Sequence, residues 1–331
     1  MNGWTKMMGF PVLELVSVAP DAAAGTCKLE LTQTWFLSDG STLTAEEAAK
    51  AWSIPVFAAA SGGGADDAKG HQMFSAGRGS LTVKGDGKWV KLNAGQNVPY
   101  RVKVCVVSRC GRRRRRRHLP PSPHLSSPHL PKYPSAMIPE LCAAIRAKAV
   151  PAVDRVGLLA DYSALARAGK VPVLEYLTVL SAYDQEDSDV VLSSLIERLA
   201  AFRGAIMSDA DLLGLWTQFG AKIVSRVLAT TGWDEKPDDG HLTKKLRGQA
   251  IGATPYFGAV VPEIVAEANR RFAGWCQDPN DTDALPSEYR AAVLGLCVAT
   301  GGEEAYEKVL EGWDSYSLDT DLKDIQVRRH A

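Results

Sequence analysis

A change of hydrophobic period divides this sequence into two parts that cannot share one type of secondary structure. Before residue 105 apolar side chains alternate with polar ones, whereas after residue 132 they recur every three or four positions. A period of two indicates a half-buried strand, and a period near 3.6 indicates an amphipathic helix. We therefore predict a small antiparallel β-sandwich at 11–104, an all-α domain at 133–331, and an intervening segment at 105–132.

The run 27–35 shows the strand pattern most clearly, because Cys27, Leu29 and Leu31 fall on one face and polar residues on the other. Short strands separated by glycine-containing turns are typical of a sandwich. The glycines at 62–64 lack the Gly-Lys-Ser/Thr sequence of a phosphate loop, so they predict a plain loop. The remaining predicted strands are 11–18, 53–59, 80–84, 88–92 and 100–104, with turns at 38–40, 62–64 and 85–87.

The helical pattern is strongest at 208–232, where one apolar stripe runs from Leu212 to Val227. Ser208 with Asp211 resembles a capping box, and Gly232 is placed to end the helix. Short links between helices of this size predict stacked antiparallel pairs, a solenoid of the HEAT or armadillo kind. The other predicted helices are 138–149, 152–168, 171–183, 190–202, 242–251, 262–274, 287–299 and 303–313.

The segment 105–132 fits neither pattern, because consecutive arginines repel one another and its prolines block helix and strand. We predict that it is disordered. Its cysteines and histidines come close to the spacing of a two-Cys, two-His zinc finger, but the prolines exclude the helix that must carry the histidines. The arginine run would also suit a nuclear-import or RNA-binding arm. We favour a third hypothesis, an intron translated in frame. The residues concerned are Cys105, Cys110, His124 and His129, with Arg112–Arg117.

Charge and composition exclude several classes of protein. The chain has 38 basic and 38 acidic residues, but eight of the basic ones lie in the intervening segment. The rest is acidic, which argues against nucleic-acid binding. Six scattered cysteines predict a reducing compartment. The absence of a long apolar run argues against a membrane span, and the first residues do not resemble a signal peptide. We expect a cytoplasmic protein without membrane or nucleic-acid partners.

Several short motifs follow one another along the chain: WTKMMGFPV at 4–12, LELTQTWFL at 29–37, WVKLN at 89–93, YRV at 100–102, DRVGLLAD at 154–161, ALARAG at 164–169, GWD at 232–234, GHL at 240–242 and LRG at 246–248. Together they resemble the C-terminal half of M1-family zinc aminopeptidases of the puromycin-sensitive type. The resemblance covers nearly all of the chain except 105–132, although Met7 and Trp35 stand where the family usually has Gln and Arg. It implies that 1–10 is the end of a catalytic domain and that the helical domain, truncated at its C-terminus, encloses a peptide cavity.

The resemblance also implies what the chain lacks. Family chemistry needs a His-Glu-x-x-His sequence and a second Glu to hold zinc, and a Gly-Ala-Met-Glu-Asn type of motif to hold the substrate amine. None of the six histidines begins such a sequence. We therefore expect no catalytic, cofactor-binding or metal-binding residues here, with zinc confined to the intact parent enzyme. The chain alone is expected to be inactive, with peptide substrate as its partner through the parent's catalytic domain.

Three charged residues remain as candidates for interdomain or cavity contacts: Asp154, Arg155 and Arg247. The cysteines on helical stripes, Cys142, Cys276 and Cys297, are expected to be inert thiols, and His241 to be structural.

Besides an RNA- or nucleus-directed protein that acts through the arginine run, two functional hypotheses stay open. The chain is either a non-catalytic C-terminal part of an aminopeptidase or a stand-alone solenoid module that binds peptides or proteins. The first also predicts a large exposed apolar surface around residues 4–18, where a catalytic domain would pack.

Overall fold

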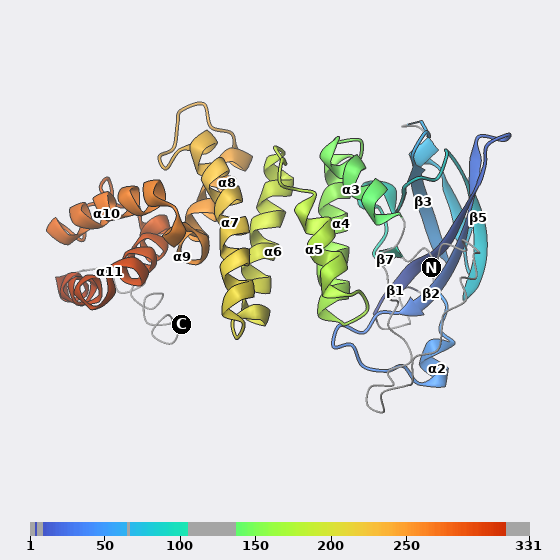
Figure 1. Cartoon of the computed structure of the whole chain (residues 1–331), viewed down its shortest axis with the longest axis horizontal. Coiled ribbons are helices and arrows are strands. Elements are labelled where there is room, and N and C mark those ends of the chain that lie inside the picture. Colours follow the sequence, from blue (N-terminus) through green and yellow to red (C-terminus); the bar gives the residue numbers. More distant parts are fainter. Residues whose placement is uncertain (1–3, 5–8, 65–66, 105–136, 316–331) are drawn as a thin grey trace, which may run out of the picture. The chain divides into compact units, whose positions relative to one another are not determined.

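The computed structural model describes residues 4, 9–64, 67–104 and 137–315 (Figure 1). The chain divides into two compact units, an N-terminal unit (Met1–Gln185) and a C-terminal unit (Glu186–Ala331). The arginine run and the four zinc-finger-like residues lie outside the described residues. Whether 11–104 and 133–331 behave as separate domains stays a prediction.

Two sheets face each other in the N-terminal unit. One has the strand order β5-β2-β1-β7 and the other has the order β4-β3-β6. β1 and β7 run parallel, with Val12 opposite Arg101, so the first sheet is mixed and the prediction of a purely antiparallel sandwich is wrong on this point. The strands are β1 (Pro11–Asp21), β2 (Thr26–Trp35), β3 (Ile54–Ala60), β4 (His71–Phe74), β5 (Arg78–Lys84), β6 (Val90–Leu92) and β7 (Arg101–Val104).

The core between the sheets is built from alternate residues of the strands. Leu13 and Leu15 of β1 are fully buried, and Val12 is almost so. The expected apolar surface at 4–18 is therefore absent from the described part of that stretch, where Trp4 also packs against the core. Gln33 bridges the two layers: its amide accepts from Trp52 N at 2.8 Å and donates to Trp52 O at 3.0 Å.

The N-terminal unit also contains helices that the period change assigns to the second half of the chain. They are α3 (Ile138–Arg146), α4 (Ala152–Arg167) and α5 (Val173–Ser181), besides the short α2 (Ala45–Ala48), η1 (Asp67–Lys69) and η2 (Ala94–Gln96). α4 packs on β7 and on the turn η2, so the helical sequence begins against the sandwich.

Side chains occupy both edges of the four-stranded sheet. At β7, Asp161 of α4 accepts a hydrogen bond from Val102 N at 3.2 Å. At β5, Gln72 of the facing sheet donates to Thr82 O at 2.6 Å. Unpaired edge groups are a template for adding further strands, and each of these two contacts occupies one such group.

The C-terminal unit is entirely helical within its described residues. Asp209, not Ser208, caps α7, because its carboxylate accepts from Leu212 N; the predicted capping box does not form. The two helices predicted at 287–299 and 303–313 both fall within α11, where a kink at Gly302, whose φ is 62°, separates them. The elements are α6 (Asp189–Ile206), α7 (Ala210–Thr231), α8 (His241–Gly252), α9 (Thr254–Phe257), η3 (Gly258–Val260), α10 (Pro262–Gln277) and α11 (Ser287–Ser315).

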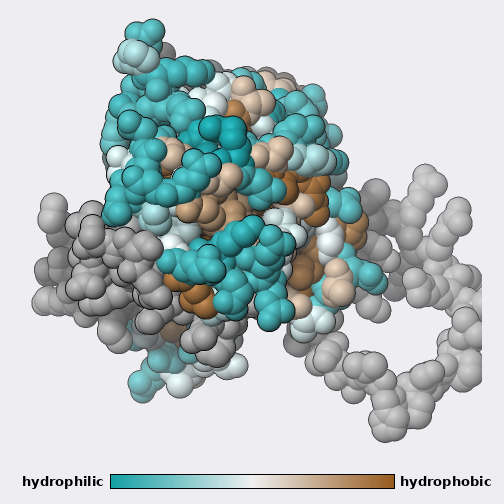
Figure 2. All heavy atoms as spheres, turned by 90° about the vertical axis from the view of Figure 1, so that its left-hand side faces the viewer, coloured by the Kyte–Doolittle hydropathy of each residue, from teal (hydrophilic) through white to brown (hydrophobic). Residues whose placement is uncertain are grey.

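Figure 2 looks onto the α10–α11 end of the chain and shows apolar side chains in patches between hydrophilic ones. None of the helices within the described ranges is long and apolar enough to cross a bilayer.

Two glycines of α7 predict opposite effects of the same substitution. A Cβ at Gly220 would lie 2.3 Å from the ring of buried Phe257, whereas Gly214 is exposed with open space around it. Gly220→Ala is expected to destabilise the chain by about 1–3 kcal/mol through overpacking. Gly214→Ala should stabilise it by up to about 1 kcal/mol, because alanine favours the helix. Urea unfolding of both variants followed by circular dichroism checks this; equal effects would show that α7 does not pack on Phe257.

Candidate functional site

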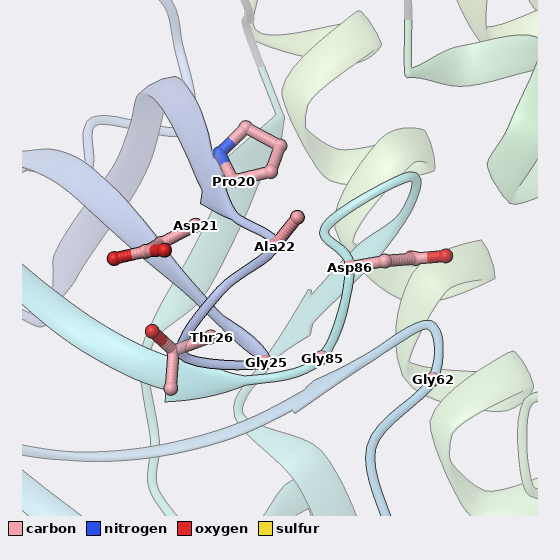
Figure 3. A pocket seen from close by; sticks show the side chains of 8 residues that line it. All are labelled: Pro20, Asp21, Ala22, Gly25, Thr26, Gly62, Gly85 and Asp86. Atoms are coloured by element: carbon pink, nitrogen blue, oxygen red, sulfur yellow. The ribbon is translucent and has the colours of Figure 1, made fainter.

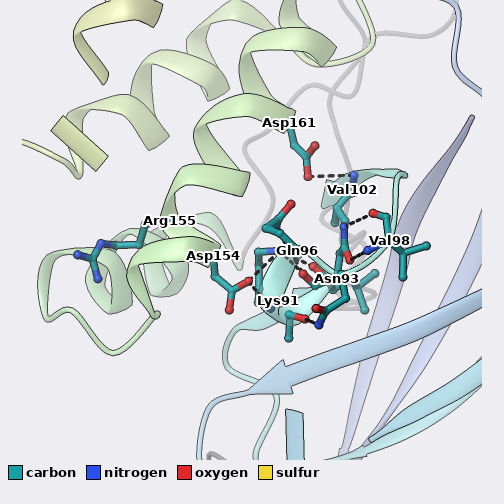
Figure 4. Close-up of polar contacts among 12 residues, drawn as sticks. Lys91, Asn93, Gln96, Val98, Val102, Asp154, Arg155 and Asp161 are labelled. Carbon is teal, nitrogen blue, oxygen red and sulfur yellow. Dashed lines mark hydrogen bonds and ion pairs between the residues drawn. The ribbon is translucent and has the colours of Figure 1, made fainter. Parts of the chain in front are cut away.

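Three of the motifs that are far apart in the sequence meet in the N-terminal unit (Figure 4). The motif at 89–93 supplies β6 and the start of the turn η2, the motif at 100–102 supplies β7, and the motif at 154–161 lies on α4. Their polar side chains point toward one another at the place where α4 meets the sandwich. We call the four charged residues Lys91, Arg101, Asp154 and Asp161 the joint cluster.

Lys91 and Asp154 form the inner part of the joint cluster. The Lys91 side chain is 1% exposed and the Asp154 side chain 3%, and Lys91 Nζ lies 3.7 Å from Asp154 Oδ1. The ammonium also donates to Leu92 O at 2.5 Å and to Asn93 O at 3.3 Å. Asp154 Oδ1 in turn accepts from Gly95 N at 2.8 Å. A buried charge needs both a counter-charge and hydrogen bonds, and this pair has them.

The turn that carries these contacts has an unusual backbone. Asn93 and Gln96 both have positive φ, 55° and 53°, which is costly for residues other than glycine. The Asn93 side chain compensates by bonding both the N–H and the C=O of Val98, at 3.1 and 2.8 Å. Gly157 of α4 lies against this turn, and a Cβ there would lie 2.0 Å from Nε2 at the flexible end of the Gln96 side chain.

Asp161 and Arg101 form the outer part of the joint cluster. Arg101 Nη1 donates to Asp161 Oδ1 at 3.2 Å, and the Arg101 side chain keeps 30% of its surface exposed while Asp161 keeps 3%. Burial raises the pKa of the Asp161 carboxyl to about 6, although Lys91 and Arg101 oppose the shift. Burial also lowers the pKa of Lys91, against the pull of Asp154 and Asp161.

Arg155 follows Asp154 in the sequence but lies apart from the joint cluster. Figure 4 shows its side chain pointing away from Asp154. Its guanidinium donates to Val150 O at 2.6 Å, and its carbonyl accepts from Tyr183 OH at 2.8 Å. The structure thus places two adjacent candidate residues in two different buried networks of the same unit.

Arg247, the third candidate, is fully buried in the C-terminal unit. Its guanidinium donates to Thr231 O, the last residue of α7, with Nη2 at 2.9 Å, and it is also paired with the Asp239 carboxylate. Arg271 holds the same loop from α10, since its Nη2 donates to Asp234 Oδ1 at 2.7 Å and its guanidinium lies 5.5 Å from the Trp233 ring. We call the loop 232–240 with these two arginines the arginine clasp.

The sequence named Asp154, Arg155 and Arg247 but missed Lys91, Arg101, Asp161 and Arg271. Lys91, Arg101 and Asp161 lie inside motifs that carry the family resemblance. The sequence therefore showed these motifs, but it did not show which charged residues pair in the fold. Arg271 belongs to no quoted motif. The sequence feature that could have pointed to Arg271 is Glu267, one helical turn before it. In the structure Glu267 accepts from Arg271 Nε at 2.8 Å.

No group of three or more His, Cys, Asp or Glu side chains that could hold a metal occurs among the described residues. Burial raises the pKa of the Cys297 thiol to about 12 and raises that of Cys142, which donates to Thr178 O at 3.7 Å. A nucleophilic cysteine needs the opposite shift.

A hollow of about 300 Å³ lies beside the β1–β2 turn (Figure 3). The two acidic residues that line it, Asp21 and Asp86, already accept hydrogen bonds from groups of the neighbouring turns. Asp21 accepts from Ala23 N and Ala24 N at 3.1 Å, and Asp86 accepts from Ser61 Oγ and from Lys88 N. A second hollow of about 280 Å³ between β3–β4 and β5 contains the Lys84–Asp67 pair. The candidate residues line neither of them.

Comparison with known proteins gives a consistent result. A family model described as the ERAP1-like C-terminal domain matches residues 131–328. "Aminopeptidase M1" of Arabidopsis thaliana is 29% identical over 99% of this chain and 34% of its own length. "Puromycin-sensitive aminopeptidase" of Caenorhabditis elegans is 25% identical over 94% of this chain and 29% of its own length. This chain therefore spans about a third of the length of these relatives.

Proposed function

The chain belongs to the family of ERAP1-like C-terminal domains, and from this premise we propose that it forms the non-catalytic C-terminal part of an M1 zinc aminopeptidase. In this role it encloses the peptide cavity of an enzyme that removes N-terminal residues from peptides. The observation that carries the proposal has two parts. Aminopeptidases match almost the full length of the chain, while no His-Glu-x-x-His sequence occurs in it.

The helical part of the chain supports an enclosing role. Consecutive helices of the C-terminal unit contact one another in chain order, as α6 with α7 and α7 with α8. We propose that they continue as a HEAT-like or armadillo-like solenoid, whose stacked helix pairs form a concave wall. The joint cluster would then fix the first helices of this wall to the sandwich.

A cytoplasmic location is part of the same proposal. The four cysteines within the described residues, Cys27, Cys142, Cys276 and Cys297, are all free thiols. Free buried thiols are typical of a reducing compartment.

The proposal predicts that the purified chain contains no stoichiometric zinc and does not cleave aminoacyl reporter substrates, because it lacks the zinc-binding sequence. Metal analysis and a fluorogenic cleavage assay test this expectation. A chimera provides the positive test: the Arabidopsis thaliana relative, with its matched third replaced by this chain, should cleave the reporters. Cleavage by the chain alone, or a folded chimera without cleavage, would contradict the proposal.

A second candidate function has support of its own. A side chain bonds one backbone group at each edge of the four-stranded sheet, and Val12, Leu13 and Leu15 of β1 are buried, as expected of a self-sufficient module. The C-terminal unit also exposes large apolar side chains, among them Leu215 at 66% and Val260 at 54%. The alternative is a stand-alone module that binds peptides or proteins without enzymatic activity. An inactive chimera together with tight peptide binding by the chain alone would favour it.

A further inference from the structure

The outer faces of the two sheets differ in polarity. β5 of the first sheet exposes only polar side chains, as expected of a sheet face that meets water. These side chains are Arg78, Ser80, Thr82 and Lys84. β3 of the second sheet contains no polar residue on either face.

Alternate residues of β3 point away from the core. The inward ones belong to the core between the sheets, whereas Pro55, Phe57 and Ala59 point outward and are partly exposed. On β4, Met73 lies opposite Pro55 and His71 lies opposite Phe57, so these five residues share one face. We call them the β3 outer face. An apolar run without polar alternation is typical of a strand that is covered on both faces.

Burial of this side of the sheet decreases from β6 toward β4. Lys91 of β6 lies opposite Ala59 and is 1% exposed, with Asp154 of α4 at 3.7 Å. On the other side of β3, Met73 is 55% exposed and His71 is exposed as well. Among the described residues, the part of the β3 outer face toward β4 is therefore the accessible part.

The N-terminal end of the chain is fixed beside this accessible part. Trp4 Nε1 donates to Ser53 O at 3.0 Å, and Ser53 stands two positions before Pro55. Ser75, two positions after Met73, donates from its Oγ to Ser53 Oγ at 3.0 Å. The three residues before Trp4 can span at most about 11 Å. A protein part joined to this end of the chain is thus held next to the β3 outer face.

We propose that the β3 outer face is the docking surface for the catalytic part of the aminopeptidase, which covers it with an apolar surface of its own. This inference rests on the proposed function, in which a catalytic part precedes this chain. A short connection raises the effective concentration of the attached part to the millimolar range, so that part occupies the face ahead of a second copy or a free partner. The interface expected near residues 4–18 then lies on β3 and β4, and the buried residues of β1 have no share in it.

Methionine oxidation tests the docking surface in the chimera described above. In the chain alone, hydrogen peroxide should oxidise Met73 and Met207 at similar rates, because their exposed fractions are 55% and 54%. In the chimera the rate at Met73 should fall at least about five-fold, because a covered thioether is shielded from the reagent. Mass spectrometry of the peptides that contain the two methionines measures both rates.

The outcomes separate this inference from the proposed function. An unchanged Met73 rate in a chimera that cleaves the reporters would overturn the docking surface and leave the proposed function in place. Protection of Met73 in a folded chimera without cleavage would support the docking surface and contradict the proposed function. Protection in the chain alone that increases with its concentration would identify a second copy as the occupant and overturn the inference.

A pair of charge substitutions gives an independent measurement. Met73→Glu places a carboxylate on the β3 outer face, and Leu174→Glu places one on α5, where Leu174 is 72% exposed. Neither should shift the unfolding midpoint of the chain alone. In the chimera, Met73→Glu should shorten the half-life of thermal inactivation at least about five-fold, because docking would bury an unpaired charge, whereas Leu174→Glu should not. Equal half-lives of the two chimera variants would contradict docking on this face.

Discussion

Replacing Asp154 with asparagine is expected to destabilise the N-terminal unit by about 3 kcal/mol or more, because it leaves the Lys91 ammonium buried without its counter-charge. Asparagine keeps an oxygen that can accept from Gly95 N. The substitution therefore removes the negative charge but keeps this hydrogen bond, so the loss of stability reports on the charge. Chemical unfolding of the full chain, followed by fluorescence and circular dichroism, measures the loss.

A second substitution makes this expectation specific. Lys91→Met in the Asp154→Asn background removes the stranded charge, so the double variant should recover most of the lost stability. Lys103→Met serves as the matched control, because Lys103 is partly exposed and pairs with Glu14 at 3.1 Å on the outer face of the sheet. A double variant that is no more stable than Asp154→Asn alone would show that Lys91 and Asp154 are not coupled.

Replacing Arg247 with alanine should have a comparable effect on the C-terminal unit, on the order of 3–5 kcal/mol. The guanidinium is fully buried and binds both the end of α7 and the carboxylate of Asp239. Its removal leaves Thr231 O without this donor and Asp239 without its ion pair. Arg247→Lys should restore only part of the loss, since an ammonium cannot reproduce the planar fork.

The same loop provides a control for Arg247. Lys244 Nζ lies 2.5 Å from Glu235, but both side chains are more than 40% exposed. Exposed pairs contribute at most about 1 kcal/mol, so Lys244→Ala should change the unfolding free energy little. If the Arg247 and Lys244 variants lose similar stability, the arginine clasp does not hold the loop.

Strands and helices whose apolar residues recur at a regular spacing were predictable from the sequence. β2 was expected at 27–35 and is found at Thr26–Trp35, because its alternation alone specifies a half-buried strand. β4 was missed, since three of the four residues in His71–Phe74 are exposed and no alternation marks them. The short α2 was also missed, although Thr44 and Glu47 form a full capping box that the sequence displays.

The joint cluster shows the limit of sequence reasoning in physical terms. Asp154 stood out as a charge near a helix start, but its partner lies 63 positions earlier on β6. Lys91 falls within a strand motif in which a lysine is ordinarily expected to face water. In the fold, α4 packs on the turn that follows β6, and Lys91 is 1% exposed.

The composition of the N-terminal unit has a consequence for where the chain can be divided. The family match starts at residue 131 and the hydrophobic period changes near the same position, yet compactness places the division after Gln185. A protein begun at residue 133 would carry α4 with Asp154 and Asp161 but without Lys91 and Arg101. The family match thus begins inside a compact unit, and that unit joins the sandwich to the first three helices that follow it.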